Sequence, residues 1–127
     1  MLGHISFGVR DLARAIVFYD AVLVSVGWVR LWSEIPRGVG YGPPGGEEKL
    51  NLFTHADATP PGPGFHLAFD APSRAAVDAF HATALANDGS DRGQPGVRLR
   101  YGPTYYASFV TDPDGHRLEA VHQSPGP

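Results

Sequence analysis

The chain has 127 residues, enough for one compact domain and too few for two domains of ordinary size. Hydrophobic residues (43%), charged residues (18%) and a formal net charge of −3 are typical of a globular protein, and the scattered Lys and Arg exclude a nucleic-acid-binding surface. The absence of cysteine excludes disulfides, and with no signal-peptide pattern and no apolar run of about 18 residues we expect a cytoplasmic protein that does not contact membranes.

The first half of the chain predicts a strand, a helix and three more strands. The strand covers residues 4–9, and Asp11 is a good N-cap for a helix whose apolar positions recur at helical spacing as far as Val26. Gly27 stands where a helix end favours a left-handed residue. Short β-rich stretches then follow at residues 28–34, 39–41 and 49–54.

The second half predicts the same order of elements. A strand over residues 66–71 precedes a helix that begins after Ser73 and ends near Gly89, which is expected to be left-handed as well. Strands are expected at residues 97–103, 105–111 and 116–122, with the tight turn DPDG at 112–115.

The two halves align without a gap over about 24 residues when the chain is shifted by 62 positions. The identical pairs are His4 and His66, Phe7 and Phe69, Ala13 and Ala75, Phe18 and Phe80, Leu23 and Leu85, and Gly27 and Gly89. This indicates a duplication, and we expect an α+β fold of two βαβββ modules that form a curved mixed sheet around a cleft. The expected organisation is a single domain, 1–127, with modules at about 1–56 and 64–123, a loop at 57–63 and a short tail at 124–127.

The last strands of the two halves also correspond, because KLNLF aligns with RLEAV and pairs Asn51 with Glu119. If His4 and His66 head two strands that face one cleft, Glu119 completes a set of two histidines and one carboxylate. Such a set suits a divalent Fe, Mn, Ni, Zn or Co ion and leaves coordination positions open for a substrate. Asn51 offers only a weak neutral fourth position.

Each of these side chains also has a simpler interpretation. A single histidine at the head of a strand is more often a hydrogen-bonded core or rim residue, and Glu119 would suit the exposed face of an edge strand. Of Tyr105 and Tyr106, strand alternation directs one inward, where it would bind an oxyanion, and one outward. Arg117 shares the strand parity of Glu119, so it either pairs with Glu119, binds an anionic substrate or is simply solvated.

The segments HISFGVRDLARAIVFYDAVL and FVTDPDGHRLEAV resemble the vicinal oxygen chelate superfamily, which includes glyoxalase I, extradiol dioxygenases and bleomycin-resistance proteins. The resemblance covers nearly the whole chain and implies metal ligands at His4, His66, Glu119 and the position of Asn51. Glyoxalase I-like members have a glutamate at that last position, and an asparagine cannot serve as its catalytic base. The resemblance also implies a homodimer, in some members with each site completed across the two chains.

Two functions remain open at this point. The first is a metal-dependent enzyme, a lyase or dioxygenase, that chelates adjacent oxygens of a small-molecule substrate. The second is a metal-free small-molecule binding protein of the bleomycin-resistance type, with a cleft lined by Trp28, Trp32, Tyr105 and Tyr106. A member that has lost its site and serves only as an interaction module is a third alternative. No motif for a nucleotide or other organic cofactor is present.

Overall fold

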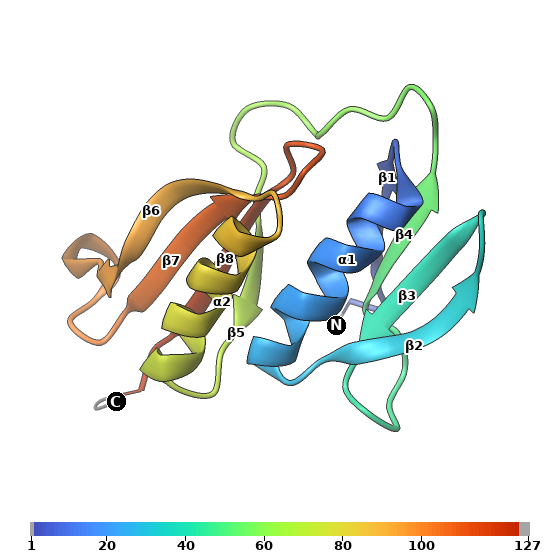
Figure 1. The fold of residues 1–127 in the computed structure, drawn as a ribbon. Helices are drawn as coiled ribbons and strands as arrows, with labels where there is room; N and C mark the ends of the chain where they lie inside the picture. Colours follow the sequence, from blue (N-terminus) through green and yellow to red (C-terminus); the bar gives the residue numbers. More distant parts are fainter. Residues whose placement is uncertain (1, 125–127) are drawn as a thin grey trace.

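A computed structural model describes residues 2–124 of the chain, and its first half forms a four-stranded mixed sheet with one helix (Figure 1). The elements are β1 (Ile5–Val9), α1 (Leu12–Leu23), a short 3₁₀ turn η1 (Val24–Val26), β2 (Val29–Glu34), β3 (Gly38–Gly42) and β4 (Leu50–Thr54). The strand order is β1-β4-β3-β2, with β1 parallel to β4 and the other pairs antiparallel.

The second half repeats this arrangement. Its elements are β5 (Leu67–Asp70), α2 (Arg74–Ala86), β6 (Ser90–Val97), a 3₁₀ turn η2 (Leu99–Tyr101), β7 (Tyr106–Thr111) and β8 (Arg117–His122). The strand order is β5-β8-β7-β6, again with one parallel pair. The predicted α+β class with two βαβββ modules is confirmed, and the strands form two separate sheets. Among the helices of residues 2–124, none has the length and apolar character of a membrane span.

The strand register supports the duplication at the level of single residues. In the first sheet Ser6 pairs with Asn51, and in the second Ala68 pairs with Glu119. Ser6 and Ala68 are 62 positions apart, the same shift that aligns the two histidines. Asn51 and Glu119 therefore occupy equivalent places in the two modules.

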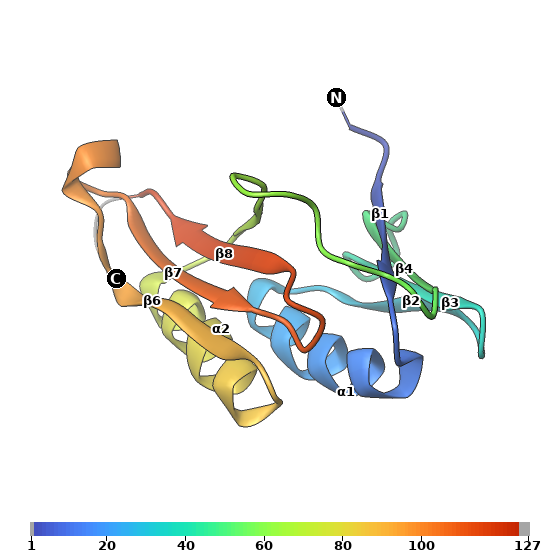
Figure 2. The ribbon, with the colours of Figure 1, turned by 90° about the horizontal axis from the view of Figure 1, so that it is seen from above.

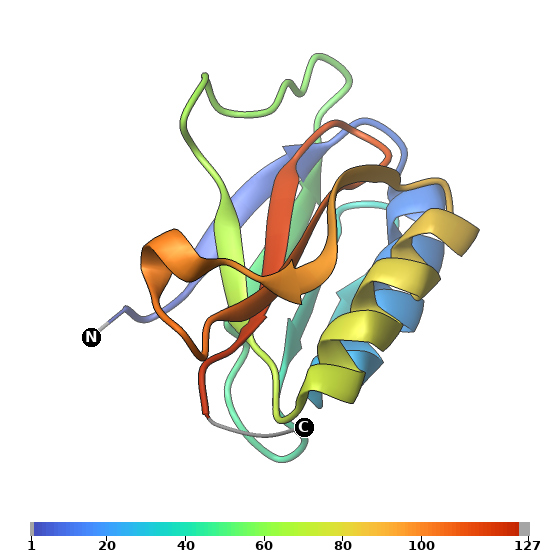
Figure 3. The same ribbon diagram turned by 90° about the vertical axis from the view of Figure 1, so that its left-hand side faces the viewer.

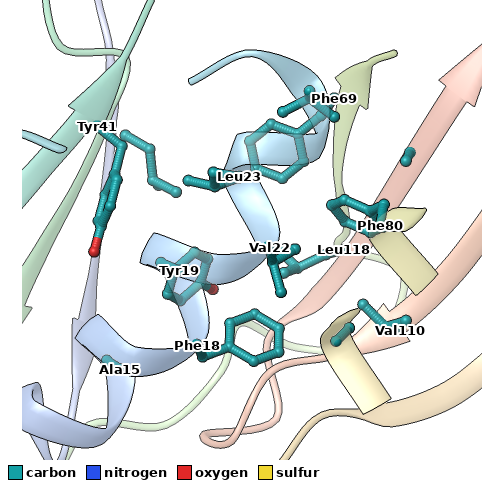
Figure 4. Packing of buried hydrophobic residues seen from close by; sticks show 14 of the residues in the cluster. Ala15, Phe18, Tyr19, Val22, Leu23, Tyr41, Phe69, Phe80, Val110 and Leu118 are labelled. Atoms are coloured by element: carbon teal, nitrogen blue, oxygen red, sulfur yellow. The ribbon is translucent and has the colours of Figure 1, made fainter. Parts of the chain in front are cut away.

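The two helices lie side by side on one side of the molecule, and both sheets lie on the other (Figures 2 and 3). The core fills the space between them, and aromatic side chains from both modules meet there, including Phe18, Phe69 and Phe80 (Figure 4). Each sheet consequently has one face against the helices and one outer face that is free of helices. The outer faces carry the polar residues that the sequence singles out.

The turn Asp112–Gly115 joins the second module to the first. Tyr19 of α1 is fully buried, and its hydroxyl donates to Asp112 Oδ2 at 2.6 Å. The backbone amide of Arg10 donates to Asp114 Oδ1 at 3.1 Å, and the Arg10 guanidinium lies 3.2 Å from the same oxygen. The predicted tight turn thus also ties the two modules together.

His116 follows this turn and is buried. Its Nε2 lies 2.8 Å from the carbonyl oxygen of Gly8, and its ring stacks on Phe7 with ring centres 3.9 Å apart. Its role in the structure is therefore to pack the second module against β1.

Two details of the second module differ from the sequence prediction. The left-handed residue after α2 is Asp88 (φ 70°) and not Gly89. The second strand of this module covers residues 90–97 and not 97–103, because a stretch with Gly93, Pro95 and Gly96 forms an irregular edge strand against β7. An edge strand tolerates proline and bulges, which a central strand does not. β6 can therefore have a sequence that is rich in glycine and proline and resembles a loop.

Gly89 is required by close packing, so we expect Gly89→Ala to lower the free energy of unfolding by about 1–3 kcal/mol. An added Cβ would lie 2.7 Å from the Ala84 carbonyl oxygen and 2.9 Å from both Phe18 Cε1 and the Thr111 carbonyl oxygen. Urea unfolding measures the change. Gly3→Ala is the control, because a Cβ there meets nothing within 4 Å, and it should change stability by less than about 0.5 kcal/mol. Equal stability of the two variants would contradict the packing argument.

Candidate functional site

Glu119 is the centre of the candidate site on the outer face of the second sheet. It lies on β8 and is only 1% exposed, whereas its neighbours Leu118 and Ala120 face the core. Glu119 Oε1 lies 2.8 Å from His66 Nε2, and Glu119 Oε2 accepts a hydrogen bond from the Tyr105 hydroxyl. A buried carboxylate is costly unless its oxygens are bonded, and here both are.

His66 connects this buried carboxylate to solvent. It immediately precedes β5, its side chain is 47% exposed, and its ring meets the Phe109 ring edge-on at 6.1 Å between centres. A cavity of about 290 Å³ opens beside it. Its lining residues are Gly64, Phe65, His66, Arg92, Phe109, Val110, Arg117 and Leu118. The imidazole therefore lies where a small molecule in the cavity would reach it.

Tyr105 and Tyr106 point to opposite sides of the sheet, as strand alternation predicts. Tyr105 contacts Glu119, whereas Tyr106 donates to Asp78 of α2 at 2.7 Å. Burial and the hydrogen bond to Glu119 raise the pKa of the Tyr105 phenol well above its usual value. Tyr105 accordingly remains a protonated hydrogen-bond donor throughout the neutral range. Arg117 is exposed at the rim of the cavity.

Two of the predicted site residues lie in the first module. His4 is exposed just before β1, at a second cavity of about 350 Å³ between the two modules. Asn51 lies on β4, is only 5% exposed, and accepts a hydrogen bond from the Trp32 indole N–H at 2.9 Å. The strand register places it opposite Ser6 and Gly40, on the outer face of its sheet.

A single chain does not bring the whole predicted ligand set together. Across residues 2–124, no group of three or more His, Cys, Asp or Glu side chains is close enough to hold a metal ion. His66 and Glu119 are in contact, whereas the cavity beside His4 is lined by neither of them. The four positions thus form two halves, one on each outer face.

The other histidines have structural partners. His81 is buried on α2 and bonds Asp91 at 2.9 Å, and this bond lowers the pKa of the Asp91 carboxyl. His122 Nδ1 lies 2.9 Å from the Ala71 carbonyl oxygen, away from Glu119. Both histidines are therefore held by contacts within the second module.

Sequence reasoning misses the Trp32–Asn51 contact and does not pair Tyr105 with Glu119. The parity of β7 gives a signal for Tyr105, because Phe109 pairs with Glu119 and Tyr105 has the same parity. For the Trp32–Asn51 contact the signal is weaker. A glycine inside a strand, here Gly40 opposite Asn51, indicates that neighbouring side chains pack closely over that position.

The sequence profile of the Glyoxalase/Bleomycin resistance protein/Dioxygenase superfamily matches residues 1–120. A glyoxalase/bleomycin resistance protein from Albidiferax ferrireducens T118 is 33% identical, with 98% of this chain and 99% of that chain covered and a TM-score of 0.83. No match was found among the curated proteins.

More distant crystal structures share the fold. One is a glyoxylase/bleomycin resistance protein/dioxygenase domain from Frankia sp. EAN1pec, with 22% identity, coverage of 100% and 94%, and a TM-score of 0.71. Another is the genomically encoded fosfomycin resistance protein FosX from Listeria monocytogenes, with 17% identity, coverage of 98% and 94%, and a TM-score of 0.72.

Proposed function

Because the chain belongs to the glyoxalase/bleomycin resistance protein/dioxygenase superfamily, we propose that it is a metal-dependent enzyme, a lyase or dioxygenase, that acts on a small molecule. The observation that carries the proposal is the buried carboxylate of Glu119, in contact with an accessible imidazole beside a cavity. A carboxylate and a neutral imidazole that converge in this way are donors typical of a divalent metal site.

His66 and Glu119 fit such a metal as two adjoining ligands, one nitrogen and one carboxylate. A divalent Fe, Mn, Ni, Zn or Co ion bound there would act as a Lewis acid toward two adjacent substrate oxygens. Tyr105 holds the carboxylate in place through its hydroxyl and is a positioning residue. Arg117 and Arg92 at the rim of the cavity would attract a substrate that carries negative charge.

The third ligand in this proposal is His4 of the partner subunit in a homodimer. Packing of α1 against α2 joins the modules of one chain through their helices, and the two outer faces hold separate halves of the ligand set. A second copy that packs the outer face of its first sheet against the outer face of this chain's second sheet would supply the missing histidine.

Mixing two inactive variants tests the site shared between subunits. Each homodimer of His4→Ala or of Glu119→Ala lacks one ligand in both sites and should retain little metal. A mixed dimer contains one intact site, so equal mixing after unfolding and refolding should restore about a quarter of the parent metal content, if subunits pair at random. Metal is measured by elemental analysis after gel filtration.

The matched control mixes His66→Ala with Glu119→Ala. These two residues contribute to the same half-site, so every mixed dimer still lacks a ligand in each site and metal should not return. Metal recovery in both mixtures, or in neither, would contradict a site that combines His4 with the partner's half.

A metal-free binding protein remains the second candidate, because aromatic rings lie on the outer face of the first sheet. The Trp32 and Phe53 rings are 5.8 Å apart, and the Arg37 guanidinium lies over both. Such a surface suits a planar ligand. Tight ligand binding that persists in the presence of a chelator would favour this alternative.

A further inference from the structure

The Asn51 side chain is oriented by its hydrogen bond to Trp32. The indole nitrogen Nε1 lies 2.9 Å from Asn51 Oδ1. An indole N–H can only donate, so the Asn51 atom that it faces is the carbonyl oxygen and not the amide nitrogen. The amide therefore presents its Nδ2 group on the other side.

Gly40 provides the space for this pair. A Cβ on Gly40 would lie 2.0 Å from Trp32 Nε1 and 2.4 Å from Asn51 Oδ1. Gly40 is not among the glycines with positive φ, so the position requires space and not an unusual backbone conformation. Since any larger residue would displace the pair, the orientation of the amide is built into β3 as well as β4.

The Nδ2 group of Asn51 is left without a protein partner. Among residues 2–124 it donates no hydrogen bond, and it is not one of the fully buried atoms that lack a partner, so it retains contact with solvent. It belongs to a side chain that is otherwise nearly buried and that occupies the place equivalent to Glu119. A fixed donor at the site position of the first module is thus available to a ligand.

We infer that Asn51 donates a hydrogen bond from Nδ2 to a negatively charged substrate oxygen and is not a fourth metal ligand. The inference rests on the proposed function. Asn51 Oδ1 already accepts a hydrogen bond from the Trp32 indole N–H. A cation beside Oδ1 would be repelled by the partial positive charge of that N–H hydrogen. The Nδ2 group of Asn51 instead suits a carboxylate or an oxyanion as its acceptor. A glutamate at this position would repel such an anion, because its side chain is negatively charged.

The substrate class that follows is a small anion with adjacent oxygens. The donor on one outer face and the rim arginines Arg92 and Arg117 near His66 both favour negative charge. Asn51 at this position cannot remove a proton from the substrate, because an amide is not a base at neutral pH. It stabilises a developing or existing negative charge.

Oxalate is the probe, because it is a small dianion with adjacent oxygens. Calorimetric titration of the metal-loaded protein with oxalate should show about tenfold weaker binding by Asn51→Ala than by the parent. The metal affinity of Asn51→Ala should stay within about threefold of the parent, unlike that of His4→Ala. Asn51→Asp keeps an acceptor for Trp32 and nearly the same volume, but it has no donor and its carboxylate repels an anion, so it should bind oxalate at least as weakly as Asn51→Ala. Urea unfolding of each variant shows that the weaker binding is not caused by loss of the fold.

Several outcomes would overturn the inference. A metal affinity that falls as far in Asn51→Ala as in His4→Ala would make Asn51 a ligand. Unchanged oxalate affinity in both Asn51 variants would leave it a purely structural role. If the parent binds metal and the variants give either of these results, only the inference about Asn51 is refuted. If the parent binds no metal, the proposed function is refuted together with the inference.

Discussion

Replacement of Glu119 by Gln should lower the affinity for the metal ion at least about 100-fold. Loss of a residue that only hydrogen-bonds a metal ligand lowers metal affinity by about 10–100-fold, and loss of a ligand itself should lower it further. The amide retains the shape of the side chain and still accepts a hydrogen bond from Tyr105. It also removes a buried charge, so the metal-free variant should unfold at no lower urea concentration than the parent. Loss of function without loss of stability is typical of a residue retained for a site.

Glu47→Gln is the matched control for this variant. It makes the same chemical change on an exposed side chain that is outside the predicted ligand set, and should alter neither metal affinity nor stability. Metal affinity is measured by competition with a chelator of known affinity, and stability by urea unfolding after chelator treatment. If Glu119→Gln kept the parent's metal affinity but was strongly destabilised, Glu119 would be a structural residue.

Tyr19→Phe should destabilise the protein by about 2–3 kcal/mol, because it deprives the buried carboxylate of Asp112 of a charged hydrogen bond. Burial raises the pKa of Asp112, and the bond from Tyr19 opposes this rise. Asp112 still accepts bonds from the backbone amides of Asp114 and His116, so the turn should survive. Urea unfolding measures the loss.

The destabilisation by Tyr19→Phe should depend on pH. A carboxyl whose folded pKa lies above its unfolded value favours the folded state most when protonated, so its contribution is full below about pH 4 and is lost as pH rises through the folded pKa. The variant raises that pKa further, so its deficit should be smaller near pH 4 than at pH 7. Tyr106→Phe, which removes an exposed bond to Asp78, is the control and should cost less than about 1 kcal/mol at either pH. An equal deficit at both pH values would contradict the assignment of a charged Asp112.

The fold and the equivalence of Asn51 and Glu119 can be predicted from the sequence because duplication leaves a fixed shift between the halves. Phe18 and Phe80, which are identical across this shift, are both fully buried in the core, so the two modules use this position alike. Helix starts are equally local, and the side chains of Asp11 and Ser73 accept the expected amide bonds at the starts of α1 and α2.

The contacts across the site are not predictable in this way, because they depend on long-range geometry. Trp32 and Asn51 are 19 residues apart and meet only through the strand pairing of β3 with its neighbours. The edge strand β6 resembles a loop in composition, and the separation of His4 from His66 depends on how the helices pack. A linear pattern indicates which residues share a strand face but not how two sheets are placed in space.

Elemental analysis of the untagged protein, purified without chelator and reloaded with each candidate ion, measures whether His66 and Glu119 hold a divalent metal. We expect close to one Fe, Mn, Ni, Zn or Co ion per chain after gel filtration. We expect His66→Ala to lose this ion while its circular dichroism spectrum stays that of the parent. Parent protein that retains no ion, or His66→Ala that retains as much as the parent, would contradict a metal site at His66 and Glu119.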